Sequence, residues 1–143
     1  PGYSGFRNLM FLAQLSGGMT KDEIKRLLKL VGLNPADRKP VSKYSMGMRQ
    51  RLGIAQAIME NPSLLILDEP MNGLDNQGVE DIRELLLKLK AEGKTILLAS
   101  HNREDISVLC DTVAEIDRGK MIGSGRKEIT FAGGCAHGTD RLA

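Results

Sequence analysis

The sequence predicts an α/β fold in which a parallel sheet is flanked by helices. Short apolar runs of strand length alternate along the chain with segments that carry apolar residues at helical spacing. Parallel strands connected through helices form the right-handed crossover units that are typical of this class. The composition, 41% hydrophobic and 27% charged, is that of a globular protein and excludes collagen-like and disordered chains.

Two further features of the composition bear on function. No apolar run reaches the roughly 18 residues of a membrane-spanning helix, and no secretory signal is visible, so we expect Cys110 and Cys135 to be reduced thiols. The net charge is +2, but a basic block over residues 21–60 precedes an acidic block over residues 61–117. This asymmetry fits either a phosphate-facing or partner-facing segment or two unrelated solvated surfaces.

The first third of the chain is expected to hold two helices. Leucines at helical spacing indicate a helix over residues 8–15. Thr20, followed three residues later by Glu23, is a capping-box sequence that begins a second helix, and Gly32 can end it. The apolar face of this second helix comprises Ile24, Leu27, Leu28 and Val31. Residues 34–43 are expected to form a basic loop.

The rest of the chain predicts three strands and three helices. Ser45 can cap a helix that runs to about Glu60, with an apolar face formed by Leu52, Ala55, Ile58 and Met59. Residues 64–67 and 95–99 are expected to be strands buried on both faces, since their apolar runs are continuous. A helix over residues 77–92 lies between them, and Asn102 caps a short helix through Cys110. A third strand over residues 112–117 ends at a turn over residues 118–120.

The first chemical signal is a pair of adjacent acids, Asp68 and Glu69, directly after the apolar strand 64–67. In open parallel sheets, ligands bind at the carboxyl ends of the strands. One carboxylate at such a point can hold a hydrated Mg²⁺, and the other can accept a proton from water. The pair taken alone is equally compatible with a polar strand end before the turn at Pro70.

The order of further polar residues favours the functional interpretation. Ser45 and Gly47 lie at a helix start, where outward-facing backbone N–H groups can bind an anion, and Arg49 and Arg51 add positive charge. A tight turn over residues 72–75 ends in Asp75, and Ser100-His101 places an imidazole at the next strand end. Each of these has a structural explanation alone, but chance is a poor explanation for their order and spacing together.

Residues 44 to about 125 resemble the second half of an ATP-binding-cassette (ABC) transporter ATPase subunit. Tyr44-Ser45-Met46-Gly47-Met48-Arg49-Gln50-Arg51 is similar to the family's signature motif, and residues 64–69 to the Walker B strand with the catalytic glutamate. Residues 72–75 resemble the D-loop, and His101 resembles the switch histidine. Met46 and Met48 stand where the usual motif has a glycine and a glutamine. The sequence is most similar to the bacterial branch that exports bacitracin-type peptides and lantibiotics.

The resemblance implies an incomplete P-loop NTPase core. Residues 1–43 correspond to part of the helical subdomain, and residues 44–125 to the signature helix and the C-terminal part of the core. Residues 126–143 form a tail, rich in small residues, that resembles a non-native extension. We expect the chain to be a fragment that lacks the N-terminal half with the P-loop.

The resemblance also implies a role for each site residue, with ATP and Mg²⁺ as cofactors. Ser45, Gly47 and Met48 would contact ATP held by a second ATPase subunit, and Asp75 would connect the two sites of the dimer. Asp68 would hold Mg²⁺. Glu69 would activate the attacking water, and His101 would contact the γ-phosphate.

Two apparent motifs are rejected. Ser16-Gly17-Gly18 matches the usual signature letters, but Ser16 lies 52 residues before Asp68 and precedes a capped helix, so the segment predicts a turn. Gly93-Lys94-Thr95 matches the end of a P-loop, but Lys88 stands where the first glycine belongs. A helix also precedes these residues and a strand follows them, which is the reverse of a P-loop.

The resemblance predicts an ATPase subunit that couples ATP hydrolysis to export of a peptide antibiotic or a similar substrate. Its partners would be a second ATPase subunit and a transmembrane permease rather than nucleic acid, at the cytoplasmic face of the cell membrane. Two other interpretations remain open at this point. The chain could come from a soluble ABC ATPase of DNA repair or translation, or be a non-catalytic interaction module.

The missing half has a structural consequence. In the family's sheet, the strand leading into the P-loop lies between the strands that match residues 95–99 and 112–117. Its absence would leave apolar strand edges with unpaired backbone groups, which are costly when buried. We expect pairing of these edges between chains, a different strand pairing within the chain, or disorder after about residue 111.

Overall fold

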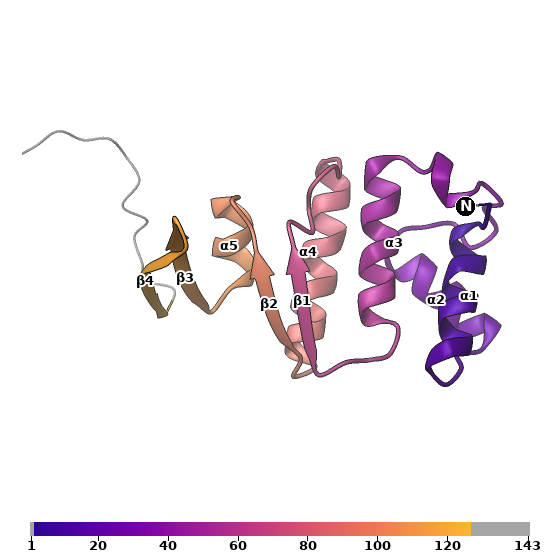
Figure 1. Cartoon of the computed structure of the whole chain (residues 1–143), viewed down its shortest axis with the longest axis horizontal. Coiled ribbons are helices and arrows are strands. Elements are labelled where there is room, and N and C mark those ends of the chain that lie inside the picture. Colours follow the sequence, from indigo (N-terminus) through magenta and orange to yellow (C-terminus); the bar gives the residue numbers. More distant parts are fainter. Residues whose placement is uncertain (1, 127–143) are drawn as a thin grey trace, which may run out of the picture. The chain divides into compact units, whose positions relative to one another are not determined.

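A computed structural model describes residues 2–126 of the chain (Figure 1). They belong to two compact units, one ending at Leu109 and the other beginning at Cys110. The elements of the first unit are α1 (Gly5–Ser16), α2 (Lys21–Leu30), a 3-10 turn (Val41–Lys43), α3 (Met46–Ile58), β1 (Leu64–Asp68), α4 (Asn76–Ala91), β2 (Thr95–Ala99) and α5 (Arg103–Leu109). The mixed α/β class predicted from the sequence is confirmed.

Local capping chemistry sets the helix boundaries. Thr20 Oγ1 accepts the backbone N–H of Glu23 (3.2 Å), and Glu23 Oε2 accepts that of Thr20 (2.7 Å), so the predicted capping box is present. Gly32 follows α2 with φ 75°, a left-handed conformation that glycine adopts readily. α1 begins three residues earlier than predicted because Ser4 caps it through the N–H of Arg7.

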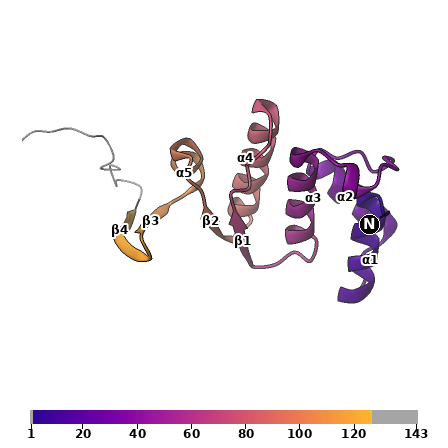
Figure 2. The same ribbon diagram turned by 45° about the horizontal axis from the view of Figure 1, so that its top comes forward.

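The first three helices pack together and bury one apolar cluster. α2 contacts both α1 and α3, and Figure 2 shows these three helices gathered at the N-terminal end of the chain. Fully or almost fully buried side chains of these helices and of the residue after α2 include Leu9, Ala13, Ile24, Leu28, Val31, Ile54 and Ala55. The apolar face predicted for α3 and its C-terminal end is buried as expected.

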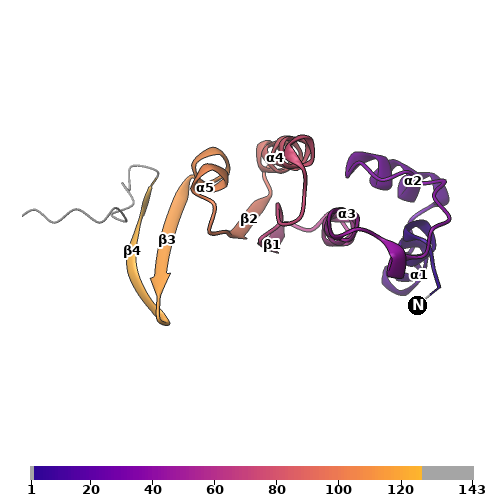
Figure 3. The ribbon, with the colours of Figure 1, turned by 90° about the horizontal axis from the view of Figure 1, so that it is seen from above.

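The sheet of the first unit consists of two parallel strands. β1 and β2 pair in register from Leu64 opposite Thr95 to Asp68 opposite Ala99. Figure 3 shows α4 and α5 on the same side of these strands. Leu65 and Leu67 are buried, but Leu64, Ile66 and Leu97 are more than half exposed. The prediction that both strands are buried on both faces is therefore wrong for residues 2–126, because helices cover one face only.

A buried ion pair links α4 to α5. The guanidinium of Arg83, on α4, donates to Asp105 Oδ1 through Nε (2.9 Å) and Nη2 (2.6 Å). Glu80 and Glu104 are further acceptors, at 2.9 and 3.2 Å. Hydrogen bonds to Glu104 and Asp105 raise the pKa of Arg83, which keeps the guanidinium charged. Because the Asp105 side chain is 2% exposed, this pair fixes where α5 lies on α4.

The second unit contains a β-hairpin. β3 (Thr112–Asp117) pairs antiparallel with β4 (Lys120–Arg126), and Arg118 and Gly119 form the predicted turn with positive φ values. β4 continues through residues 124–126, where the sequence predicted no element. Residues 127–143 of the predicted tail, with Cys135, lie outside the described residues.

The strand that is missing from the sheet was expected to lie between β2 and β3. Within residues 2–126, β2 pairs only with β1, and β3 pairs only with β4, so no alternative pairing supplies a further neighbour for β2. The disorder expected after about residue 111 is wrong for residues 112–126, since β3 and β4 are formed. Pairing of the open edge between chains stays a prediction.

The packing of α4 predicts unequal effects of two neighbouring substitutions. Leu86 is 2% exposed, whereas Leu87 is 39% exposed. In the full-length protein, Leu86→Ala should lower the free energy of unfolding by about 2–5 kcal/mol, because it leaves a cavity in the core. The matched control Leu87→Ala should change it by about 0.5 kcal/mol or less. Denaturant unfolding measures both, and equal losses would contradict the assigned packing.

Candidate functional site

The parallel register brings the predicted acids and the histidine to one edge of the sheet. Asp68 is the last residue of β1 and pairs with Ala99, the last residue of β2. Glu69 follows β1 directly and donates its backbone N–H to the carbonyl of Ala99 (2.9 Å). His101 follows β2 by two residues, so both chain segments leave the sheet at the same place.

Glu69 and His101 are in direct contact. Oε1 of Glu69 accepts the backbone N–H of His101 (3.0 Å) and lies 2.6 Å from its Nδ1. An ionised carboxylate can only accept hydrogen bonds, so the ring proton is assigned to Nδ1. This assignment leaves Nε2 of the imidazole available for another group. The His101 side chain is 84% exposed, and that of Glu69 is 33% exposed.

This contact changes the acidity of the carboxyl group. The hydrogen bond from the His101 side chain lowers the pKa of Glu69, against a smaller opposing effect of burial. A lowered pKa keeps Glu69 ionised to lower pH than an ordinary glutamate. The carboxylate is therefore in the form that can accept a proton at neutral pH.

The backbone of Glu69 is also unusual. Its φ is 46°, in the left-handed region that residues with a side chain seldom adopt, at a cost of about 1–2 kcal/mol. Such conformations persist where the surroundings hold them, and they cluster at functional sites. The turn that follows is stabilised by the Asn72 N–H, which donates to the Glu69 carbonyl (3.0 Å).

Asp68 lies at the same edge of the sheet, next to Glu69, and its side chain is exposed. Residues 2–126 contain no group of three or more His, Cys, Asp or Glu side chains that could hold a metal ion. Mg²⁺ is commonly bound by one or two carboxylates with waters and substrate phosphates, so a lone carboxylate at this edge fits that chemistry.

Ser45 caps α3, as predicted. Its Oγ accepts the backbone N–H of Met48 (3.2 Å), and the first turn of α3 contains no acidic residue. Tyr44, immediately before it, is buried and accepts the N–H of Gly5 through its hydroxyl (3.0 Å). The start of α3 is thereby attached to the start of α1, and it presents an electropositive helix end at the surface.

The segment that resembles the signature motif packs closely against residues 72–75, which resemble the D-loop. A Cβ at Gly47 would lie 2.8 Å from the carbonyl oxygen of Gly73, and a Cβ at Gly73 would lie 2.6 Å from Met46 Cγ. Both glycines are therefore required by close packing, and the Gly73 φ of 76° adds a second reason there. Asp75 then caps α4 by accepting the N–H of Gly78 (3.0 Å).

Two residues of α3 have contacts that sequence reasoning did not predict. Gln50 Nε2 donates to the backbone carbonyl of Glu69 (3.2 Å). Arg51 donates to the carbonyl of Val31 (2.8 Å) and pairs with Asp81 (3.1 Å). In the sequence, both residues continue the segment that resembles the signature motif. No sequence pattern predicts which distant residues Gln50 and Arg51 bind.

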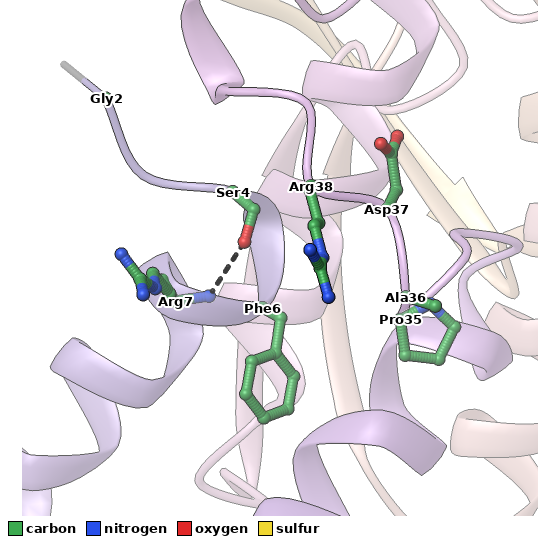
Figure 4. A pocket seen from close by; sticks show the side chains of 8 residues that line it. All are labelled: Gly2, Ser4, Phe6, Arg7, Pro35, Ala36, Asp37 and Arg38. Carbon is green, nitrogen blue, oxygen red and sulfur yellow. Dashed lines mark hydrogen bonds between the residues drawn. The ribbon is translucent and has the colours of Figure 1, made fainter.

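A pocket of about 670 Å³ lies away from this edge, beside the start of α1 (Figure 4). It is lined by Gly2, Ser4, Phe6, Arg7, Pro35, Ala36, Asp37 and Arg38. None of the predicted site residues belongs to it. The predicted chemistry is therefore located on an open edge of the sheet rather than in this pocket.

The two rejected motifs have the structures expected of them. α1 ends at Ser16, and Gly17 and Gly18 form a turn with φ values of 115° and 91°. Gly93, at φ 87°, ends α4 ahead of β2 and does not begin a phosphate-binding loop. Among residues 2–126, no helix combines the length and the apolar character needed to cross a membrane.

Comparison with known proteins adds independent evidence. The family model described as ABC transporter matches residues 2–72. The chain is 47% identical over 120 residues to the bacitracin transport ATP-binding protein BcrA of Enterococcus faecalis, covering 83% of this chain and 39% of that protein. It is 45% identical over 105 residues to the lantibiotic transport ATP-binding protein SrtF of Streptococcus pyogenes, covering 73% and 46%. The chain thus spans less than half the length of these relatives.

A solved structure has the same fold. The dimeric structure of a post-hydrolysis state of the ATP-binding cassette MJ0796 bound to ADP and Pi matches with a TM-score of 0.79 at 20% identity. The match covers 91% of this chain and 59% of that one. The order of the sequence segments that resemble the family's motifs agrees with these comparisons. The chain belongs to the family of ABC transporter ATP-binding proteins.

Proposed function

We propose that the full-length protein is the ATPase subunit of an ABC transporter that exports a peptide antibiotic or a similar substrate. The observation that carries this proposal is the contact of Glu69 with His101 beside Asp68, at the carboxyl edge of the sheet. Similarity to bacitracin and lantibiotic transport proteins supports the substrate class. The subunit would lie on the cytoplasmic face of the cell membrane.

The geometry supports a division of labour among the acids and the histidine. Glu69 is ionised and accepts a proton from the attacking water. Asp68 would hold Mg²⁺, which neutralises phosphate charge when it is bound. His101 donates its Nδ1–H to the carboxylate of Glu69, and its Nε2 contacts the γ-phosphate.

The remaining site residues would serve a second subunit. Ser45 caps α3, and Gly47 and Met48 lie in its first turn, whose N–H groups and helix dipole favour a phosphate group on ATP held by the partner. Asp75, which caps α4, would connect the two sites of the dimer. The helical subdomain, residues 1–43, would transmit the movement to a transmembrane permease.

A test of the whole proposal uses Glu69→Gln. In the full-length protein with its permease, this substitution should abolish magnesium-dependent ATP turnover, because the amide cannot accept the proton. A host dependent on the transporter should also become sensitive to bacitracin or to a lantibiotic. Turnover in Glu69→Gln equal to that of wild type would favour a non-catalytic interaction module. Copurification of the protein with DNA or ribosomes instead of membranes would favour the soluble ATPase.

The 143-residue chain alone should hydrolyse ATP negligibly. Most ligands of a bound triphosphate belong to the P-loop, and this sequence contains no G-x-x-x-x-G-K-[ST] segment. Phosphate release from the pure chain, with the full-length protein as positive control, measures this. Magnesium-dependent release that Glu69→Gln eliminates would contradict the prediction.

His101→Ala should slow hydrolysis more than it weakens ATP binding. A contact to the γ-phosphate made mainly in the transition state affects kcat rather than ground-state affinity, and an electrostatic donor of this kind is typically worth about 100-fold or more. Steady-state kinetics and equilibrium nucleotide binding on the full-length protein separate the two effects. Equal losses in both would show that the role assigned to His101 is wrong.

A further inference from the structure

Glu69 is held in a conformation that its own sequence neighbourhood does not favour. Its φ of 46° is left-handed, and the residue before a proline is restricted further by the proline ring. Pro70 itself is buried, so the chain has little freedom to relax after Glu69. External contacts must therefore keep this backbone in place.

Three hydrogen bonds hold the Glu69 backbone. The N–H donates to the Ala99 carbonyl on β2, and the carbonyl accepts the N–H of Asn72 from the same turn. The third donor is Gln50 Nε2, at 3.2 Å from the Glu69 carbonyl oxygen and 19 residues away in the sequence. Gln50 is half-buried and lies on α3. Of these three hydrogen bonds, the one from Gln50 is the bond that connects Glu69 to α3.

The carbonyl carbon and the Cβ of Glu69 are both attached to its Cα, so a change in φ moves the carbonyl and the carboxylate together. If φ leaves its left-handed value of 46°, the carboxylate leaves the position in which it meets the N–H and Nδ1 of His101. We propose that Gln50 is a positioning residue that orients the Glu69 carboxylate by holding its backbone carbonyl. This inference rests on the proposed function, in which Glu69 activates water.

The same helix offers a matched control. Gln56 also lies on α3, and its Nε2 also donates a side-chain hydrogen bond, to Asn8 Oδ1 (2.7 Å), away from the site. Methionine is close to glutamine in length and helix propensity but cannot donate. Gln50→Met and Gln56→Met therefore each remove a side-chain hydrogen bond from the same helix, and only the bond of Gln50 reaches Glu69.

The kinetic test uses the full-length protein in complex with its permease. Gln50→Met should lower kcat about tenfold or more with KM for ATP changed less than about twofold, because a misplaced catalytic group costs rate rather than binding. Gln56→Met should change neither value more than about twofold. A kcat of Gln50→Met within about twofold of wild type, or a similar loss in Gln56→Met, would overturn the proposal.

A structural readout separates this inference from the proposed function. Crystal structures of full-length wild type and Gln50→Met should differ at Glu69, with the left-handed φ and the contact to His101 Nδ1 lost in the variant. Retention of both in Gln50→Met would overturn the positioning role even if the wild type hydrolyses ATP. Absence of ATP turnover in the wild type would instead refute the proposed function, while the change at Glu69 would still support the role of Gln50.

Discussion

The site depends on the contact between the start of α3 and the turn that follows β1. Gln50 donates to the carbonyl of Glu69, and the backbone of Gly47 packs against that of Gly73. A methyl group at Gly47 would be too close to the carbonyl oxygen of Gly73, so the two segments meet at backbone distance there. This contact joins the start of α3 to the turn after β1, although 23 residues separate Ser45 from Asp68.

Two arginines attach this surface to the rest of the first unit. Arg51 joins the end of α2, through the carbonyl of Val31, to Asp81 on α4. Gly32 and Gly78 leave room for its guanidinium, since a Cβ at either would lie within 3 Å of an Nη atom. Arg83 then ties α4 to α5 through Asp105. The position of α5, which begins two residues after His101, thus follows from a buried ion pair, and removal of one partner would leave the other charge uncompensated.

The conformation of Glu69 shows how strain and chemistry coincide. A left-handed glutamate before a buried proline is unfavourable alone, and hydrogen bonds to β2, to α3 and within its own turn offset its cost. The same arrangement directs the carboxylate to His101, whose hydrogen bond lowers the pKa of Glu69. A carboxylate that is fixed in direction suits proton transfer better than a mobile one.

The sequence by itself determined the element order, the helix caps and the chemical identity of the edge. Thr20, Ser45 and Asp75 act as caps through bonds that span only three residues, and the sequence places His101 at a strand end that neighbours the acids. The tertiary structure decided which face of β1 is covered, what Gln50 and Arg51 contact, and which conformation Glu69 adopts. These depend on groups 19 to 30 residues apart, such as Gln50 with Glu69 and Arg51 with Asp81. Local patterns indicate periodicity and capping, but they carry no information about which distant surface supplies a partner.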